Sequence, residues 1–125
     1  MRAYDRNFSP PAPIAEVSLL HPVTKVTSGP LQGKLDTGAD ISVIPEGFVS
    51  KLKLSAKAYL WARGYDGTFS HRPVYYVGLR IEGHELVAVR CIAADRRNML
   101  IGRNVLNRFL LTLGGKNLQF NLQPI

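Results

Sequence analysis

Cysteine and long apolar runs are scarce in this chain of 125 residues. Its single cysteine, Cys91, lies in an apolar stretch, so it is expected to be a core thiol and cannot form a disulfide within the chain. No apolar run approaches the ~18 residues of a membrane-spanning helix, and the first residues lack the apolar centre of a secretory signal. We therefore expect a cytoplasmic protein with no membrane partner.

Metal-ligand clusters and several common catalytic motifs are also missing. The three histidines, His21, His71 and His84, are far apart in sequence and do not show the spacing of zinc ligands. No serine stands in a Gly-x-Ser-x-Gly motif, and nothing resembles a phosphate-binding loop. The sequence thus predicts no metal site and no cofactor.

Acidic residues are few. The chain has 9 Asp and Glu residues and 16 Lys and Arg residues, so its net charge is +7. Such a charge raises the expectation of an anionic partner such as nucleic acid. The basic residues are scattered, and no basic run is interleaved with aromatic residues as in single-strand binders. A solvated basic surface is therefore the favoured interpretation, and a nucleic-acid-binding β domain is kept only as an alternative.

Short apolar runs alternate with turn residues along the chain, which is typical of an all-β domain. Two short helices are also expected, one from Pro45 to about Leu54 and one over 104–110. Turn residues predict hairpins at 64–67 and 82–85. Strands are expected at 14–20, 31–35, 41–44, 58–63, 68–77, 79–81, 86–93, 99–102 and 118–122.

Proline separates an N-terminal arm from the remainder of the chain. Three of the 8 prolines fall at positions 10, 11 and 13, so residues 1–13 are expected to form an irregular arm. The Ser28-Gly29-Pro30 segment is expected to interrupt the strands. Residues 14–125 suit one domain, and their strand pattern favours a closed, barrel-like all-β fold.

The sequence Leu35-Asp36-Thr37-Gly38-Ala39 has the residues of a catalytic carboxylate loop. A preceding strand holds the Asp36 carboxylate rigidly, and Gly38 lets the backbone turn close beside it. The Thr37 hydroxyl can bond to neighbouring backbone, and Ala39 leaves space beside the carboxylate. Downstream, the sequence Leu100-Ile101-Gly102-Arg103-Asn104 leads into the second expected helix, and its glycine permits close packing behind the aspartate loop.

Together these two segments resemble the retroviral-type, single-motif aspartic proteases, the retropepsins. LDTGAD at 35–40 and LIGRN at 100–104 stand in the family's order and at about its spacing, and the resemblance covers roughly residues 31–122. It implies an acid-protease half, a closed β-barrel with a flap hairpin and one or two short helices. It also implies that Asp36 is the catalytic aspartate and that Thr37, Gly38 and Ala39 support it.

The resemblance implies further roles around this aspartate. Thr37 would grip its twin across a dimer axis, and the Gly38 carbonyl would meet the substrate backbone. Asp40 resembles the family's second aspartate, which binds substrate backbone and pairs with an arginine, here Arg103. For Asp40 and Arg103, an ion pair that merely holds the helix against the loop is an equal and compatible interpretation.

The hairpin tip Gly64-Tyr65-Asp66-Gly67 stands where the family has its flap, so the resemblance makes these residues part of the substrate-binding region. The tip has fewer glycines than the retroviral pattern and carries Trp61, Arg63 and Tyr65. Tyr65 either covers the site or is an exposed turn aromatic. The long N-terminal arm and the extended C-terminus also depart from the pattern, which leaves the dimer interface open.

Peptide hydrolysis of this type needs two carboxylates that share one proton. The chain has a single Asp-Thr-Gly, so a homodimer with one Asp36 per subunit is expected. The prediction is a pepstatin-sensitive aspartic endopeptidase that acts on an extended polypeptide, with apolar residues flanking the cut by resemblance alone. The main alternative is a catalytically idle peptide-binding or dimerisation module of the same fold.

Overall fold

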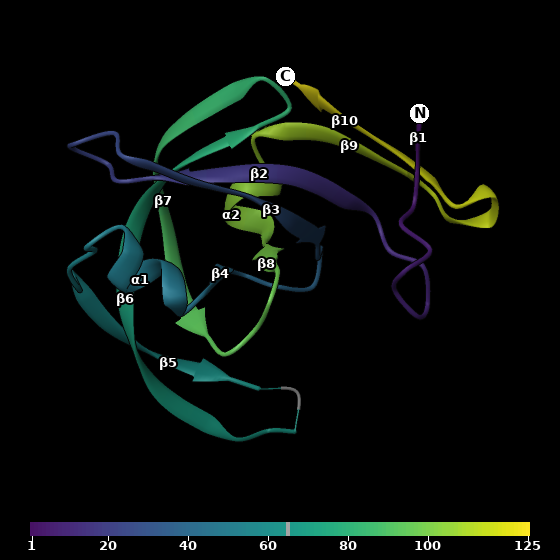
Figure 1. Cartoon of the computed structure of the whole chain (residues 1–125). Helices are drawn as coiled ribbons and strands as arrows, with labels where there is room; N and C mark the ends of the chain where they lie inside the picture. Colours follow the sequence, from purple (N-terminus) through teal and green to yellow (C-terminus); the bar gives the residue numbers. More distant parts are fainter. Residues whose placement is uncertain (65) are drawn as a thin grey trace.

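Pairing between the first and the sixth strand of a sheet closes this chain into a barrel. The computed structural model describes residues 1–64 and 66–125. The sheet has the order β2 (Ile14–Leu20), β3 (Thr27–Leu35), β8 (Met99–Ile101), β4 (Ser42–Pro45), β7 (His84–Ala94), β6 (Phe69–Ile81) and β5 (Ala58–Arg63). A further antiparallel pairing of β2 with β6 closes the barrel and leaves β5 outside it (Figure 1). The predicted all-β barrel is confirmed.

Period-two alternation of side chains fills the inside of this barrel with aliphatic residues. On β2, residues Ala15, Val17 and Leu19 point inward, and the exposed Glu16 lies between two of them. The core that results is buried from solvent, so the fold does not depend on a disulfide. Its largest fully buried side chains include Phe120, Leu20, Ile44, Leu79, Ile81, Met99, Ile101, Val74, Val77 and Val89.

Two long hairpins extend from the wall of the barrel. In the β6–β7 turn, both Glu82 and Gly83 have positive φ, of 52° and 75°, as a two-residue type I′ turn requires. The turn predicted at 82–85 is therefore present and tighter than expected. The β5–β6 hairpin projects below the barrel in Figure 1, where the flap is predicted.

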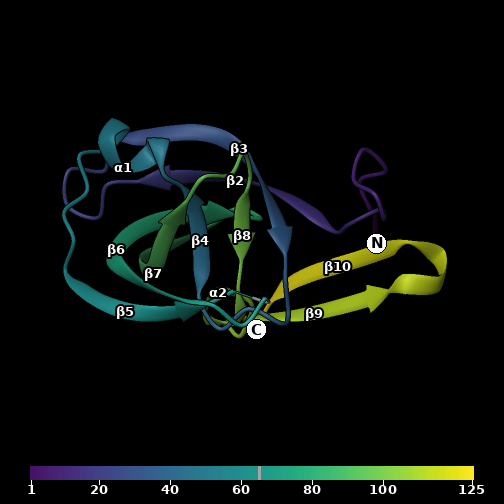
Figure 2. The ribbon, with the colours of Figure 1, turned by 90° about the horizontal axis from the view of Figure 1, so that it is seen from below.

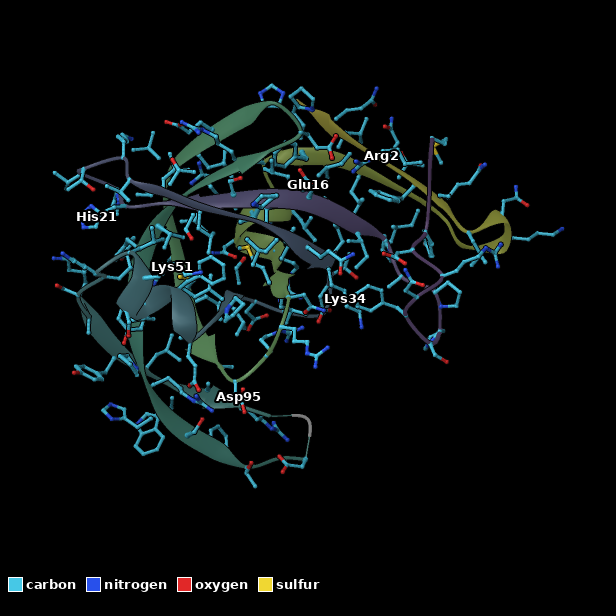
Figure 3. All side chains as sticks on the ribbon, viewed as in Figure 1. Arg2, Glu16, His21, Lys34, Lys51 and Asp95 are labelled. Atoms are coloured by element: carbon cyan, nitrogen blue, oxygen red, sulfur yellow. The ribbon has the colours of Figure 1, made fainter. Side chains whose placement is uncertain are left out.

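A second, three-stranded sheet consists of β1 (Arg2–Ala3), β10 (Gln119–Pro124) and β9 (Phe109–Gly114), in that order. It projects to one side of the barrel (Figure 2). Within this sheet, the Arg2 side chain of β1 packs on β10 (Figure 3), with its guanidinium carbon 4.7 Å from the centre of the Phe120 ring. A short 3-10 helix, η1 (Gly115–Asn117), joins β9 to β10. The arm expected to be irregular thus contains a two-residue strand, because it adds an edge to β10.

Three sequence-based element boundaries are wrong. The helix expected at 104–110 is only α2 (Arg103–Leu106), because the chain from Phe109 onward pairs with β10 as β9. The helix expected from Pro45 is only α1 (Gly47–Lys51), since Pro45 belongs to β4 and pairs with β7. Ser28-Gly29-Pro30 does not interrupt a strand; it lies within β3, where the register with β2 shifts.

In the part of the chain that the structure describes, no helix is long and apolar enough to cross a membrane.

Candidate active site

Asp36 lies at the end of β3, where the chain leaves the barrel wall. Its backbone N–H donates to the carbonyl of Ile101 at 2.9 Å, so the end of β8 holds the backbone of the aspartate. The carboxylate Oδ1 accepts a hydrogen bond of 2.9 Å from the N–H of Gly38. The N–H of Ala39 is 3.3 Å from the carbonyl oxygen of Asp36. Asp36 is therefore held in a tight turn, and it is half-buried.

Gly102 packs directly against the backbone of this loop. A Cβ at position 102 would lie 2.8 Å from both the carbonyl carbon and oxygen of Ile41. It would also lie 3.0 Å from the carbonyl oxygen of Ala39. Backbone atoms cannot give way as a flexible side chain does, so glycine alone fits here without a shift of the aspartate loop.

Arg103 connects three points of the loop. Its backbone N–H donates to the carbonyl of Ala39 at 2.8 Å, and its Nη1 donates to the carbonyl of Thr37 at 2.8 Å. Its Nη2 forms an ion pair with Asp40. The Arg103 and Asp40 side chains are 44% and 85% exposed, so this pair contributes only about 0–1 kcal/mol to stability. The contacts of Arg103 therefore serve mainly to position the loop.

A buried serine, which the sequence analysis did not identify, links the two motifs. Ser42 is fully buried, and its hydroxyl donates to Oδ1 of Asn104 at 2.8 Å. The same hydroxyl accepts a hydrogen bond of 3.0 Å from the N–H of Gly102. Asn104 in turn donates from Nδ2 to the carbonyl of Arg90 at 2.7 Å. The signal in the sequence that could have identified this residue is a serine at an inward-facing position of an apolar strand, six residues after Asp36.

A cavity of about 630 Å³ lies beside the loop, within the size range of ligand-binding pockets. Gly38, Ala39 and Asp40 line it; Gly38 and Asp40 are two of the residues expected to bind substrate. The tip residues Gly64, Asp66 and Gly67, also expected there, do not line this cavity, and the β5–β6 hairpin contributes its β5 strand instead. Its other lining residues are Ile41, Val43, Leu60, Trp61, Ala62, Arg63, Arg90, Ile92, Leu100 and Asn104.

Asp66 organises the tip of the β5–β6 hairpin. Asp66 Oδ1 accepts hydrogen bonds from the Thr68 hydroxyl at 2.7 Å and from the Thr68 N–H at 3.0 Å. These bonds, the hydroxyl first, hold the pKa of Asp66 below its usual value. The Gly64 N–H donates to the Thr68 carbonyl at 2.9 Å. Tyr65, predicted to cover the site or to be exposed, lies outside the described residues.

The loop between β7 and β8 holds a second arginine, Arg96, that the sequence analysis did not assign. Its side chain donates from Nη2 to Oδ1 of Asn98 at 2.6 Å and from Nε to the Asn98 carbonyl at 2.8 Å. Burial lowers the pKa of Arg96, and the negative charge of Asp36 opposes that shift. Figure 3 labels the preceding residue, Asp95, between the barrel and the β5–β6 hairpin. Arg96 is therefore a half-buried cation that Asn98 holds in this loop.

Among the described residues, no group of three or more His, Cys, Asp or Glu side chains is placed to hold a metal ion. The buried Cys91 lies in the core cluster, and burial raises the pKa of its thiol to about 12.

Several solved structures share the fold of this chain. A retropepsin-like aspartic protease from Rickettsia conorii superposes with a TM-score of 0.63 at 18% identity, over 99% of this chain and 90% of that one. The protease of simian foamy virus (mac) superposes with a TM-score of 0.57 at 17% identity, over 76% and 92%. An EIAV protease solved with the inhibitor HBY-793 gives 0.50 at 26% identity, over 77% and 86%.

No curated protein matches the chain significantly. The family model described as aspartyl protease matches residues 24–105, which include the aspartate loop, the β5–β6 hairpin and the Gly102 segment. The chain has the retropepsin-like fold and belongs to the aspartyl protease family.

Proposed function

We propose that the chain is an aspartic endopeptidase that works as a homodimer, with one Asp36 from each copy. The observation that carries this proposal is that Asp36 is held at two points. Its backbone N–H donates to the carbonyl of Ile101, and its carboxylate Oδ1 accepts from the N–H of Gly38. A preorganised carboxylate in a family of peptide hydrolases is suited to acid–base chemistry. Residues 14–125 would form the protease domain.

The chemistry requires two aspartates in different protonation states. The charged carboxylate takes a proton from a water molecule, whose oxygen attacks the carbonyl carbon of the scissile bond. The protonated carboxyl group donates its proton to the carbonyl oxygen. Collapse of this tetrahedral species breaks the C–N bond, and the amine leaves with a proton from the dyad. Two neighbouring carboxyl groups do not both ionise easily, because their negative charges would repel. Since one of them must keep its proton for catalysis, we expect the rate to be higher at acidic pH.

A second copy of the chain would complete the site. Thr37 is exposed beside Asp36, which suits contact with its twin across a two-fold axis. The projecting sheet offers a surface for this association, because β9 is its edge strand. Leu110 and Leu113 on that strand are 55% and 45% exposed, and apolar surface of this kind favours association.

The substrate would be an extended polypeptide segment between the flap and the aspartate loop. The cavity there has β5 on one side and Gly38 and Asp40 on the other, so a strand-like peptide can run between them. Asp40 would accept hydrogen bonds from the substrate backbone, while its ion pair with Arg103 keeps it in place.

Digestion of a denatured protein mixture across pH 3 to 8, read by mass spectrometry, tests this proposal. The wild type should cut, and Asp36→Asn should not. Cleavage that survives in Asp36→Asn would overturn it. If neither protein cuts at a concentration where the dimer is demonstrated, the idle peptide-binding module is favoured, and a rise in Tm on adding pepstatin would then report peptide-like binding without catalysis.

A further inference from the structure

The cavity beside the aspartate loop has an apolar floor. Val43 of β4 and Leu100 of β8 line the cavity on the outer face of the barrel, where each alternates with core-facing neighbours. Ile92 of β7 and Ile41 of the aspartate loop extend this surface, and Leu60 of β5 faces it from the flap. Such a floor packs against the aliphatic part of a substrate side chain.

The wall of the same cavity is cationic. Arg90 of β7 and Arg63 of β5 both line it. Asp40 is the single acid among the described lining residues, and it is paired with Arg103. In the described part of the chain, the Arg90 side chain has no ion pair. The cavity therefore carries positive charge that its own residues do not neutralise.

The backbone of Arg90 is also held by a hydrogen bond. Its carbonyl accepts the hydrogen bond of 2.7 Å from Asn104 Nδ2, and Asn104 is held by the buried Ser42. On the strand, Arg90 pairs with Tyr76 of β6 and lies between the buried residues Val89 and Cys91, so its side chain is directed away from the core. The guanidinium thus starts from a rigid part of the barrel and not from a loop.

We infer that this cleft selects polypeptides with an acidic side chain in the cavity next to the cut, and that Arg90 is the residue that sets this preference. The inference rests on the proposed function and replaces the apolar preference expected from family resemblance. Glutamate fits best, because its methylene groups pack on the apolar floor while its carboxylate accepts two parallel hydrogen bonds from the guanidinium.

Matched peptides with Glu, Gln or Leu at the position that occupies the cavity test the inference. The position is identified from the cut sites in the protein digest, and kcat/KM is measured at pH 5 to 6, where the glutamate is largely ionised. The wild type should prefer Glu over Gln by about tenfold, as expected for a hydrogen bond to a charged group. Arg90→Met should bring the two peptides to within about twofold.

A charge reversal and a remote arginine provide the controls. Arg90→Glu should prefer a Lys peptide over the Glu peptide, which a purely structural role of Arg90 would not produce. Arg108→Met, at an exposed arginine that does not line the cavity, should keep the preference of the wild type. Equal cleavage of the Glu, Gln and Leu peptides by the wild type would overturn the inference and leave the endopeptidase assignment intact.

Absence of all cleavage would instead count against the proposed function, and binding then tests the cavity by itself. The same fluorescently labelled peptides are titrated with Asp36→Asn and with Asp36→Asn/Arg90→Met, and fluorescence anisotropy gives the Kd values. Tighter binding of the Glu peptide that is lost with Arg90 supports the acidic preference. Equal Kd values for the three peptides would refute it.

Discussion

The buried hydroxyl of Ser42 lies 2.8 Å from Oδ1 of Asn104, and this hydrogen bond locks β4 onto the start of α2. The same hydroxyl accepts the N–H of Gly102 at 3.0 Å. One oxygen atom, the Ser42 hydroxyl, therefore joins β4, which follows the aspartate loop, to the Gly102–Asn104 segment, which packs behind that loop.

Ser42→Ala should lower the free energy of unfolding by about 1–3 kcal/mol, because the Gly102 N–H loses its acceptor and Oδ1 of Asn104 keeps only the backbone N–H of residue 42. Urea unfolding followed by circular dichroism measures this value. Ser50→Ala, at an exposed serine of α1, is the control and should change stability by less than about 0.5 kcal/mol. Equal effects of the two substitutions would contradict the assigned role of Ser42.

Gly102→Ala should destabilise the protein by about 1–3 kcal/mol or more, because its Cβ overpacks the backbone of Ile41. Gly47→Ala is the matched control, since a Cβ there would meet nothing within 4 Å. Restriction of the unfolded chain should make that control neutral or slightly stabilising. Thermal unfolding distinguishes them, and a Gly102→Ala protein as stable as the control would show that the aspartate loop moves freely.

Arg103→Lys should affect activity more than stability. A lysine cannot contact both the Thr37 carbonyl and Asp40 as the guanidinium does, while the exposed ion pair itself contributes only about 0–1 kcal/mol. If the aspartate loop shifts by an ångström, kcat/KM should fall by about 10²-fold. Peptidase kinetics and urea unfolding of the same sample measure both quantities. Unchanged kcat/KM would indicate that the loop holds its geometry without Arg103.

Cys91 should react with thiol reagents only after unfolding, because it is fully buried and its pKa is raised from 9.0 to about 12. Between these values the unfolded thiol releases its proton and the folded thiol keeps it. The contribution of Cys91 to stability is therefore complete below pH 9.0 and declines above it by about 1.4 kcal/mol per pH unit. Cys91→Ala should lack this component of the alkaline loss; rapid labelling of the native protein would contradict the prediction.

Leu113→Glu should weaken dimerisation without unfolding the chain, since the side chain is exposed on the edge strand β9. Sedimentation velocity should show dissociation at a higher protein concentration than for the wild type, with specific activity falling in parallel. Ser50→Glu is the control, at an exposed polar residue of α1 outside this sheet. Identical dissociation of both variants and the wild type would move the proposed interface away from this sheet.

Much of the barrel could be predicted from the sequence because its strands carry local signals. The alternation of 14–20 matches β2, and the Asp-Gly and Glu-Gly turns match the two hairpins. Helical spacing over 104–110 misled the prediction, since Phe109 and Leu110 pair with β10, a segment more than ten residues away. Such pairing overrides local propensity and cannot be read from one segment.

The site divides in the same way. Asp36 and Gly102 stand in recognisable motifs, whereas Arg90 is one of many scattered basic residues in the sequence. Arg90, Val43 and Leu100 line one cavity only because β8, β4 and β7 are neighbours in the sheet. The specificity of the cleft is thus a property of the sheet order, which no spacing in the chain reveals.

Strand β6 joins the β5–β6 hairpin to the barrel wall without a break. It is continuous from Phe69 to Ile81, pairing with β5 near the tip and with β7 and β2 in the barrel wall (Figures 1 and 2). Arg72 also anchors it, through a hydrogen bond of 3.2 Å from Nη1 to the carbonyl of Ala93. Because one strand forms both the outer hairpin and part of the barrel wall, a displacement of the hairpin would have to bend β6 along its length, and the bond between Arg72 and Ala93 opposes that bend.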